Sequence, residues 1–195
     1  MVEGGIIILV LLLLFRTKNG NTAIRVKRHK NYLKRAKRMH RKLARKPPRE
    51  VFYSLRSVNP YVFEELILVA FNTIGFKVKR SKRYSGDGGV DGKVKIDGDW
   101  YFIQAKKYSG YINPSHVKDF KALCDRSGKN GFFIHTGKTG KESYNHVGDS
   151  VKIISGNKLL RMFETTSERR SFFDRGSLQR EKITVLFALK KKEDA

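Results

Sequence analysis

Hydrophobic and polar positions divide the chain into an apolar N-terminal run, a basic stretch and a longer segment in which helical and strand-like patterns alternate. The longer segment begins at Asn59, a suitable helix cap that is followed by Pro60 and by apolar residues at helical spacing up to Gly75. This pattern predicts an amphipathic helix of about four turns. A strand is predicted next, over residues 76–80.

Two further strands, residues 90–96 and 100–106, are predicted on either side of Asp97 and Gly98, a typical hairpin turn pair. The glycine-rich residues 84–91 precede this hairpin and predict an irregular loop. Helices and strands then alternate, with a helix over 116–124, a buried strand over 131–136, a helix start at 141–147 and a short strand over 151–154. An antiparallel hairpin followed by crossovers predicts an α/β domain with a mixed sheet flanked by helices.

The hairpin brings a carboxylate toward a glutamine and a lysine. With Asp97-Gly98 as the loop, Asp91 faces Gln104; with the loop shifted by one residue, Asp91 faces Lys106. Since strand side chains alternate, Gln104 and Lys106 share a face in either register. The three side chains therefore converge at the open end of the hairpin.

One carboxylate with an amide oxygen suits Mg²⁺, which takes few protein oxygens and keeps water and substrate phosphate oxygens as its other ligands. Such an ion polarises a phosphate and acidifies a bound water, and the lysine offsets the charge that develops on the phosphorane. The constellation predicts phosphodiester hydrolysis. The alternative is a surface hairpin with an ordinary charged rim.

The composition is strongly basic, with a formal net charge of +24 over 195 residues. The net charge is −1 for residues 1–15, +15 for residues 16–49 and +10 for residues 50–195. Such a protein is drawn to phosphate, whether in nucleic acid or in anionic lipid. The single cysteine, Cys124, excludes an internal disulfide framework and a multi-cysteine zinc site.

Ten consecutive apolar residues, 6–15, lie near the start of the chain, and Val2, Gly4 and Gly5 extend this run to about 14. A helix of that length rises roughly 21 Å, which is less than the roughly 30 Å hydrocarbon core. Arg16 and Lys18 at its exit predict a membrane anchor, residues 1–15, with the remainder cytoplasmic. Two alternatives to the anchor stay open: the run forms a buried or partner-binding helix, or it reflects a misassigned start or a processed segment.

The basic segment, residues 16–49, contains no acidic residue. Residues 24–46 predict a helix with a weak apolar stripe (Leu33, Ala36, Met39 or His40, Leu43) that ends at Pro47-Pro48. Three interpretations are open: contact with anionic headgroups, contact with DNA phosphates, and a solvated linker.

From Asn59 to about Phe163 the chain resembles the Mrr-like restriction endonucleases, a branch of the PD-(D/E)xK nuclease fold. The resemblance rests on five ordered motifs, which include Pro60 to Glu64, Ser85 to Gly92, Ile103 to Tyr108, Phe132 to Gly137, and Ile154 to Gly156. It implies a nuclease domain over residues 50–163. Residues 164–195 lie beyond it and receive no role.

The resemblance also implies site residues. Asp91 would be the principal metal ligand, Gln104 would contribute with the Ala105 carbonyl, and Lys106 would be the catalytic lysine; glutamine is common at the second acidic position of this family. Glu64 would match the acid on the first helix that orients a metal-bound water, with Glu65 as the neighbouring alternative.

Basic and aromatic residues beside the proposed site predict contacts with a nucleic-acid backbone, namely Lys79, Lys82, Arg83, Lys107 and Tyr108. His116 and His135 have no partner at metal-ligand spacing and are interpreted as structural. The resulting hypothesis is a Mg²⁺-dependent endonuclease that acts on double-stranded DNA, tethered to a membrane, with a homodimer left open. The alternatives are a non-catalytic binder of nucleic acid or anionic membrane and a branched-DNA resolvase.

Overall fold

The computed structural model describes residues 26–81 and 89–164 of the chain. The predicted anchor (residues 1–15), the predicted DNA contacts Lys82 and Arg83, and almost all of the C-terminal extension lie outside these residues. Within the described part, no helix has the length and apolar character needed to cross a bilayer.

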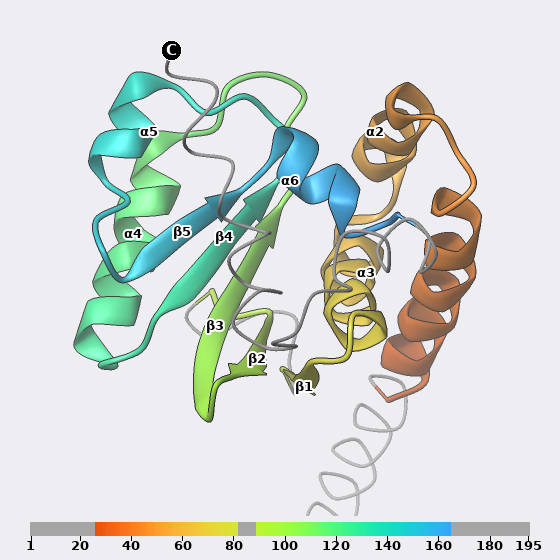
Figure 1. Ribbon diagram of the computed structural model, residues 1–195, viewed down its shortest axis with the longest axis horizontal. Helices are drawn as coiled ribbons and strands as arrows, with labels where there is room; N and C mark the ends of the chain where they lie inside the picture. The colour runs from red at the N-terminus through yellow and green to blue at the C-terminus, as the bar shows by residue number, and fades with distance from the viewer. Residues whose placement is uncertain (1–25, 82–88, 165–195) are drawn as a thin grey trace, which may run out of the picture.

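A five-stranded mixed sheet forms the centre of the fold, with the strands in chain order (Figure 1). The strands are β1 (Lys77–Arg80), β2 (Gly92–Ile96), β3 (Asp99–Lys106), β4 (Gly131–His135) and β5 (Val151–Ile154). The first three pair antiparallel, whereas β3, β4 and β5 pair parallel. The crossovers run through α4 (Pro114–Arg126) and α5 (Lys141–Asn145), as the sequence predicted.

The β2–β3 hairpin adopts the first of the two predicted registers, because Ile96 pairs with Asp99. Asp97 and Gly98 form the loop and have φ angles of 47° and 94°. Positive φ at both positions is what a tight two-residue hairpin turn requires. This register places Asp91 opposite Gln104 rather than Lys106.

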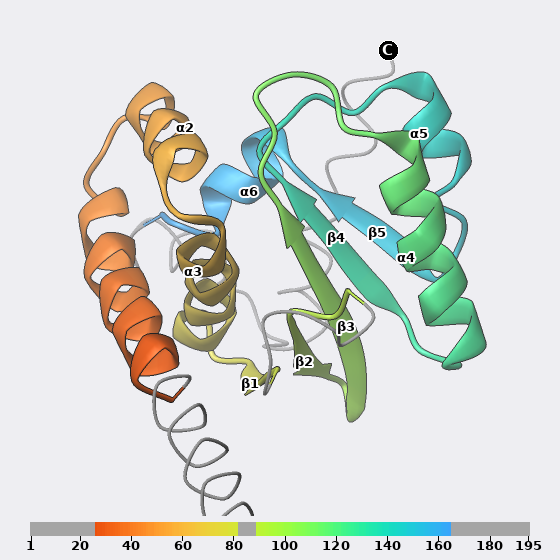
Figure 2. The same cartoon turned by 180° about the vertical axis from the view of Figure 1, so that it is seen from behind.

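Helices cover both faces of the sheet. Helix α3 (Pro60–Thr73) lies on one face and α4 with α5 on the other, while α2 (Pro48–Ser57) and the helical residues 26–43 lie beside α3, away from the sheet (Figures 1 and 2). Asn59 caps α3 as predicted, since its Oδ1 accepts from the Tyr61 N–H at 3.0 Å.

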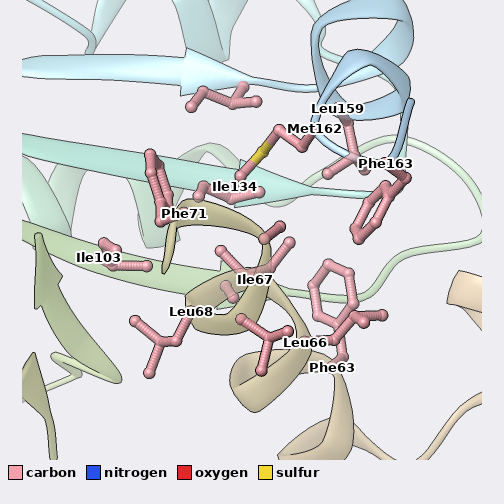
Figure 3. Packing of buried hydrophobic residues seen from close by; sticks show 14 of the residues in the cluster. Phe63, Leu66, Ile67, Leu68, Phe71, Ile103, Ile134, Leu159, Met162 and Phe163 are labelled. Carbon is pink, nitrogen blue, oxygen red and sulfur yellow. The ribbon is translucent and has the colours of Figure 1, made fainter. Parts of the chain in front are cut away.

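Helix α3 is buried on nearly all sides, although its sequence predicted an amphipathic helix with one apolar face. Phe63, Leu66, Ile67 and Phe71 are fully buried in a core that β3, β4 and α6 (Gly156–Arg161) complete (Figure 3). The other sides of α3 are covered because two further helices pack there. A second core, which includes Phe102, Phe120 and Phe133, lies between the sheet and α4.

The basic helix, residues 26–43, packs against the hydrophobic core around α3 through its predicted apolar stripe. Ala36 is 0% and Leu43 2% exposed, and Leu33 and Met39 are partly buried against the same core. The sequence did not predict α2 or α6. Each is short and buries few residues, Val51 and Leu55 in α2 and Leu159 in α6, so the apolar period is too brief to recognise.

Candidate active site

The carboxylate of Asp91 is hydrogen-bonded to β3 just beyond the last backbone pair of β2 and β3. Its backbone N–H donates to the Ile103 carbonyl at 2.9 Å, and its side-chain Oδ2 accepts from the Ala105 N–H at 2.7 Å. Gly92, paired with Ile103, is the first residue of β2 in the ladder, and Asp91 precedes it. Beyond that pair, the side chain of Asp91 provides the hydrogen-bond acceptor for β3. The bond holds one carboxylate oxygen in a fixed position on β3.

The carbonyl group of Ala105 points to the same edge of β3. In a strand, the N–H and C=O of one residue face the same neighbouring strand, and the direction alternates along the chain. The Ala105 N–H meets Asp91, so its carbonyl also faces the edge where β2 has ended. Asp91 and the Ala105 oxygen, two of the predicted metal ligands, thus lie on one edge.

Gln104 supplies a polar atom that the protein does not satisfy. Its amide Nε2 donates to the Gly89 carbonyl at 2.8 Å, which fixes the orientation of the amide. Its Oε1 is buried and has no hydrogen-bond partner within the described residues. Since nearly all buried polar atoms are paired, this free oxygen fits the coordination of a hard cation that the predicted role requires.

Gly89 allows this arrangement, a role that the sequence did not predict. Its φ is +89°, and a Cβ there would lie 2.5 Å from Gln104 Nε2. Both the backbone conformation and the close approach therefore require glycine. The glycine-rich run 84–91 was recognised only as an irregular loop, because which glycine meets a side chain depends on the hairpin register.

Lys106 lies on the same face of β3 as Gln104 and is half-buried. Its neighbour on α4 is His116, whose pKa is lowered from its ordinary value, first by burial and then by the positive charge of Lys106. His116 Nδ1 is hydrogen-bonded to the hydroxyl of Tyr108. Burial raises the pKa of that hydroxyl, although a backbone hydrogen bond at Asn113 opposes the shift.

The structure therefore places a histidine with a lowered pKa, and a tyrosine hydrogen-bonded to it, beside the candidate catalytic lysine. The hydroxyl of Tyr108 is hydrogen-bonded to His116, and the contact of Tyr108 with nucleic acid stays a prediction. His116 was predicted to be structural, and its hydrogen bond agrees with that interpretation. The sequence did not predict that His116 lies close to Lys106. A loop joins β3 to α4, and tertiary packing determines where that loop places α4.

The two acids of α3 have different surroundings. Glu65 is 2% exposed; its Oε2 lies 2.8 Å from Arg80 Nε of β1, and its Oε1 lies 3.4 Å from His29 Nδ1 of the basic helix. Glu65 thus joins three elements of the fold. Glu64, the residue before it, is half-buried, and its assignment as the water-orienting acid stays a prediction.

The predicted DNA contacts divide into two groups. Lys79 is exposed on β1 and is available to a ligand. Lys107, in contrast, donates from Nζ to the carbonyl oxygens of Arg56, at 3.0 Å, and of Val58. Its ammonium therefore caps the C-terminus of α2 in this structure, a role that the sequence did not predict because α2 itself was missed.

Within the described residues, no group of three or more His, Cys, Asp and Glu side chains could hold a metal. The candidate ligand set is of another kind, one carboxylate with an amide and a backbone oxygen. Mg²⁺ favours this kind of coordination, with few protein ligands and several water molecules.

A family model for the Mrr catalytic domain, described as a restriction endonuclease, matches residues 55–163. The matched residues begin in the last turn of α2 and include every strand of the sheet together with α3 to α6. None of the curated proteins compared with the chain matches it.

Proposed function

Because the chain belongs to the Mrr-like restriction endonuclease family, we propose that it hydrolyses phosphodiester bonds of double-stranded DNA in a reaction that requires Mg²⁺. The observation that carries the proposal is the buried Oε1 of Gln104, which has no hydrogen-bond partner among residues 26–81 and 89–164. Gln104 is next in the chain to Ala105, whose N–H holds the Asp91 carboxylate. A surface hairpin with an ordinary charged rim would not leave such an atom unsatisfied.

Asp91, Gln104 and the Ala105 carbonyl would hold the metal ion. When bound, Mg²⁺ supplies a Lewis acid for the phosphate and lowers the pKa of a coordinated water. The protein's part is to keep its three oxygens in place. The Ala105 N–H restrains the carboxylate, and the Gly89 carbonyl restrains the amide, so little reorganisation is needed when the substrate binds.

Lys106 would stabilise the negative charge that develops on the phosphate oxygens during attack. Its side chain is half-buried, and an ammonium shielded from water interacts more strongly with charge than an exposed one. The lowered pKa of the neighbouring His116, caused first by burial and then by the charge of Lys106, disfavours a positive charge on that imidazole beside the lysine. Glu64 would orient the attacking water.

The proposal is tested with purified protein, supercoiled plasmid that is either methylated or unmethylated, and buffers with and without Mg²⁺. We expect nicking or linearisation only with Mg²⁺, and a loss of at least about 100-fold in Asp91→Ala and Lys106→Ala. Lys95→Ala, an exposed lysine on β2, is the matched control and should cleave normally. Affinity for DNA, measured by fluorescence anisotropy, should survive both active-site changes.

If the unchanged protein binds DNA but none of these plasmids is cut at any Mg²⁺ concentration, the nuclease proposal fails. The protein would then be a nucleic-acid binder on this fold.

We also infer that residues 1–15 tether the enzyme to a membrane with the nuclease domain cytoplasmic. The support is the apolar run of residues 6–15 followed by Arg16 and Lys18. The full chain should sediment with membranes and resist extraction by high salt, whereas a variant that begins near Val26, and so keeps the helix that packs into the core, should not sediment. Complete release of the full chain by salt alone would contradict the tether, because a purely electrostatic attachment is screened by salt.

A further inference from the structure

The outer face of the basic helix, residues 26–43, carries an unusual density of uncompensated charge. Each of its nine Lys and Arg residues is exposed, and the helix has no acidic residue. None of the nine forms an ion pair or a side-chain hydrogen bond with the rest of the described structure. Along roughly 27 Å of helix, these charges repel one another unless an anionic partner is present.

We propose that this face is a second DNA-binding surface, which contacts the phosphate backbone of a duplex away from the catalytic site. The inference deepens the proposed function, since it adds a contact with the same class of substrate. It does not depend on catalysis, however, and the experiment below separates the two.

The orientation of the helix is fixed by the opposite face. Ala36 and Leu43 are buried in the nuclease core, and His29 lies 3.4 Å from the carboxylate of Glu65 on α3. At 100° per residue, Lys34, Arg38 and Arg41 project from the side opposite Ala36. The charged face is therefore held rigidly on the domain, so little ordering is needed when a ligand binds.

The burial of the apolar stripe favours DNA over a lipid surface. An interfacial helix binds a membrane by inserting its apolar face among the acyl chains. Here that face is occupied by the protein core, and Val26 is the only exposed large apolar residue within the described part of this helix. What remains is a cationic surface, which suits a regular array of phosphates with about one charge per 1.7 Å of duplex.

The surface lies apart from the catalytic residues. The basic helix packs beside α3 on the side away from the sheet, whereas Asp91, Gln104 and Lys106 belong to the β2–β3 hairpin within the sheet (Figures 1 and 2). A duplex held on the basic helix is separated from Lys106 by a layer of protein. We therefore expect the surface to raise affinity for long DNA without taking part in bond cleavage.

The test uses the full chain with Lys34→Gln, Arg38→Gln and Arg41→Gln combined. Glutamine has nearly the same helix propensity as lysine and arginine, so the helix should persist. The matched control combines Lys95→Gln, Lys118→Gln and Lys129→Gln, three exposed lysines on β2, α4 and the loop before β4. Both variants lose three positive charges, and circular dichroism and thermal unfolding verify that both are folded.

Binding to a fluorescent 30-base-pair duplex is measured in EDTA over a range of NaCl concentrations. We expect the basic-helix variant to bind about ten-fold more weakly at moderate salt and to lose about 2 to 3 from the slope of log K against log salt, or roughly 0.9 for each lost phosphate contact. The control should change by no more than about two-fold, an effect of net charge alone.

Equal effects in the two variants would overturn the inference. So would a loss confined to sedimentation with phosphatidylserine vesicles, a result that assigns the face to lipid. Plasmid cleavage at saturating protein should be unchanged in the basic-helix variant. If no variant cleaves DNA but the salt slope falls as expected, the second surface stands and the nuclease proposal fails.

Discussion

Gln104 donates from Nε2 to the carbonyl oxygen of Gly89 at 2.8 Å, and this bond leaves Gln104 Oε1 buried without a partner in the described structure. A glycine in the loop thus decides which end of the amide faces the candidate metal site. The predicted chemistry depends on that orientation, because only the oxygen end of the amide can coordinate a cation.

Gly89→Ala should reduce plasmid cleavage by at least about ten-fold. The new methyl would lie 2.5 Å from Gln104 Nε2 and would displace the amide, and the φ of +89° adds backbone strain of about 1 to 3 kcal/mol. Gly98→Ala is the matched control, because it has a φ of +94° but nothing within 4 Å of the added Cβ. Both variants should lose similar unfolding free energy, and only Gly89→Ala should lose activity. Equal activity in the two would contradict the role of the amide.

Lys107→Ala should lower the free energy of unfolding by about 1.5 to 3 kcal/mol, the usual range for a hydrogen bond that involves a charged group. The physical reason is that Lys107 Nζ ties the carbonyl oxygens of Arg56 and Val58 to the end of β3. Urea unfolding is the measurement, with Lys95→Ala as the control, which should change stability by less than about 0.5 kcal/mol. An unaltered midpoint in Lys107→Ala, together with a loss of DNA affinity, would return Lys107 to its predicted binding role.

The stability of the domain should decrease at mildly acidic pH because of His135. This side chain is 0% exposed, and its Nε2 and Nδ1 are hydrogen-bonded to Thr139 Oγ1 and the Gly137 N–H. Burial lowers the pKa of His135 from 6.5 to about 4. The unfolded chain therefore binds a proton that the folded chain rejects, and stability is lost as the pH falls from about 6.5 toward 4.

Between pH 7.5 and pH 5, this one histidine should remove on the order of 2 kcal/mol of unfolding free energy. Urea titrations at the two pH values, for the unchanged protein and for His135→Gln, isolate its contribution. The pH-dependent loss should be smaller in His135→Gln by that amount. Two proteins with the same loss would show that His135 is already able to protonate in the folded state.

Ala36→Glu should detach the basic helix from the nuclease core. Ala36 is 0% exposed, and burial of an unpaired carboxylate costs several kcal/mol. Amide hydrogen exchange over residues 26–43 should accelerate strongly, whereas the exposed neighbour substitution Lys37→Glu should leave it within about two-fold. Unchanged protection in Ala36→Glu would mean that the stripe does not hold the helix.

Most of the nuclease domain could be predicted from local patterns. The cap at Asn59, the turn at Asp97-Gly98 and the short strand 151–154 were each recognised from a few neighbouring residues, because propensity and hydrogen bonding at these places are local. The two missed helices, α2 and α6, have no comparable signal. Their few apolar residues matter only because the core lies beneath them.

The candidate site was only partly predictable. The alternation of strand side chains placed Gln104 and Lys106 on one face, and the turn left two registers open. The hairpin as folded selected the register that sets Asp91 against Gln104. The roles of Gly89, His116 and Lys107 depend on contacts between segments far apart in the chain, so a single sequence contained no signal for them.

The sequence by itself determined the order of strands and helices, the residue types at the site and the large excess of positive charge, because periodicity, turn chemistry and composition are written residue by residue. Tertiary structure alone decided where that charge acts. From the sequence alone, the apolar stripe that includes Ala36 and Leu43 was equally consistent with contact with a lipid surface and with burial in a protein core. Packing against α3 buried the stripe and turned the cations outward, since burial is a property of the whole fold and not of any one segment.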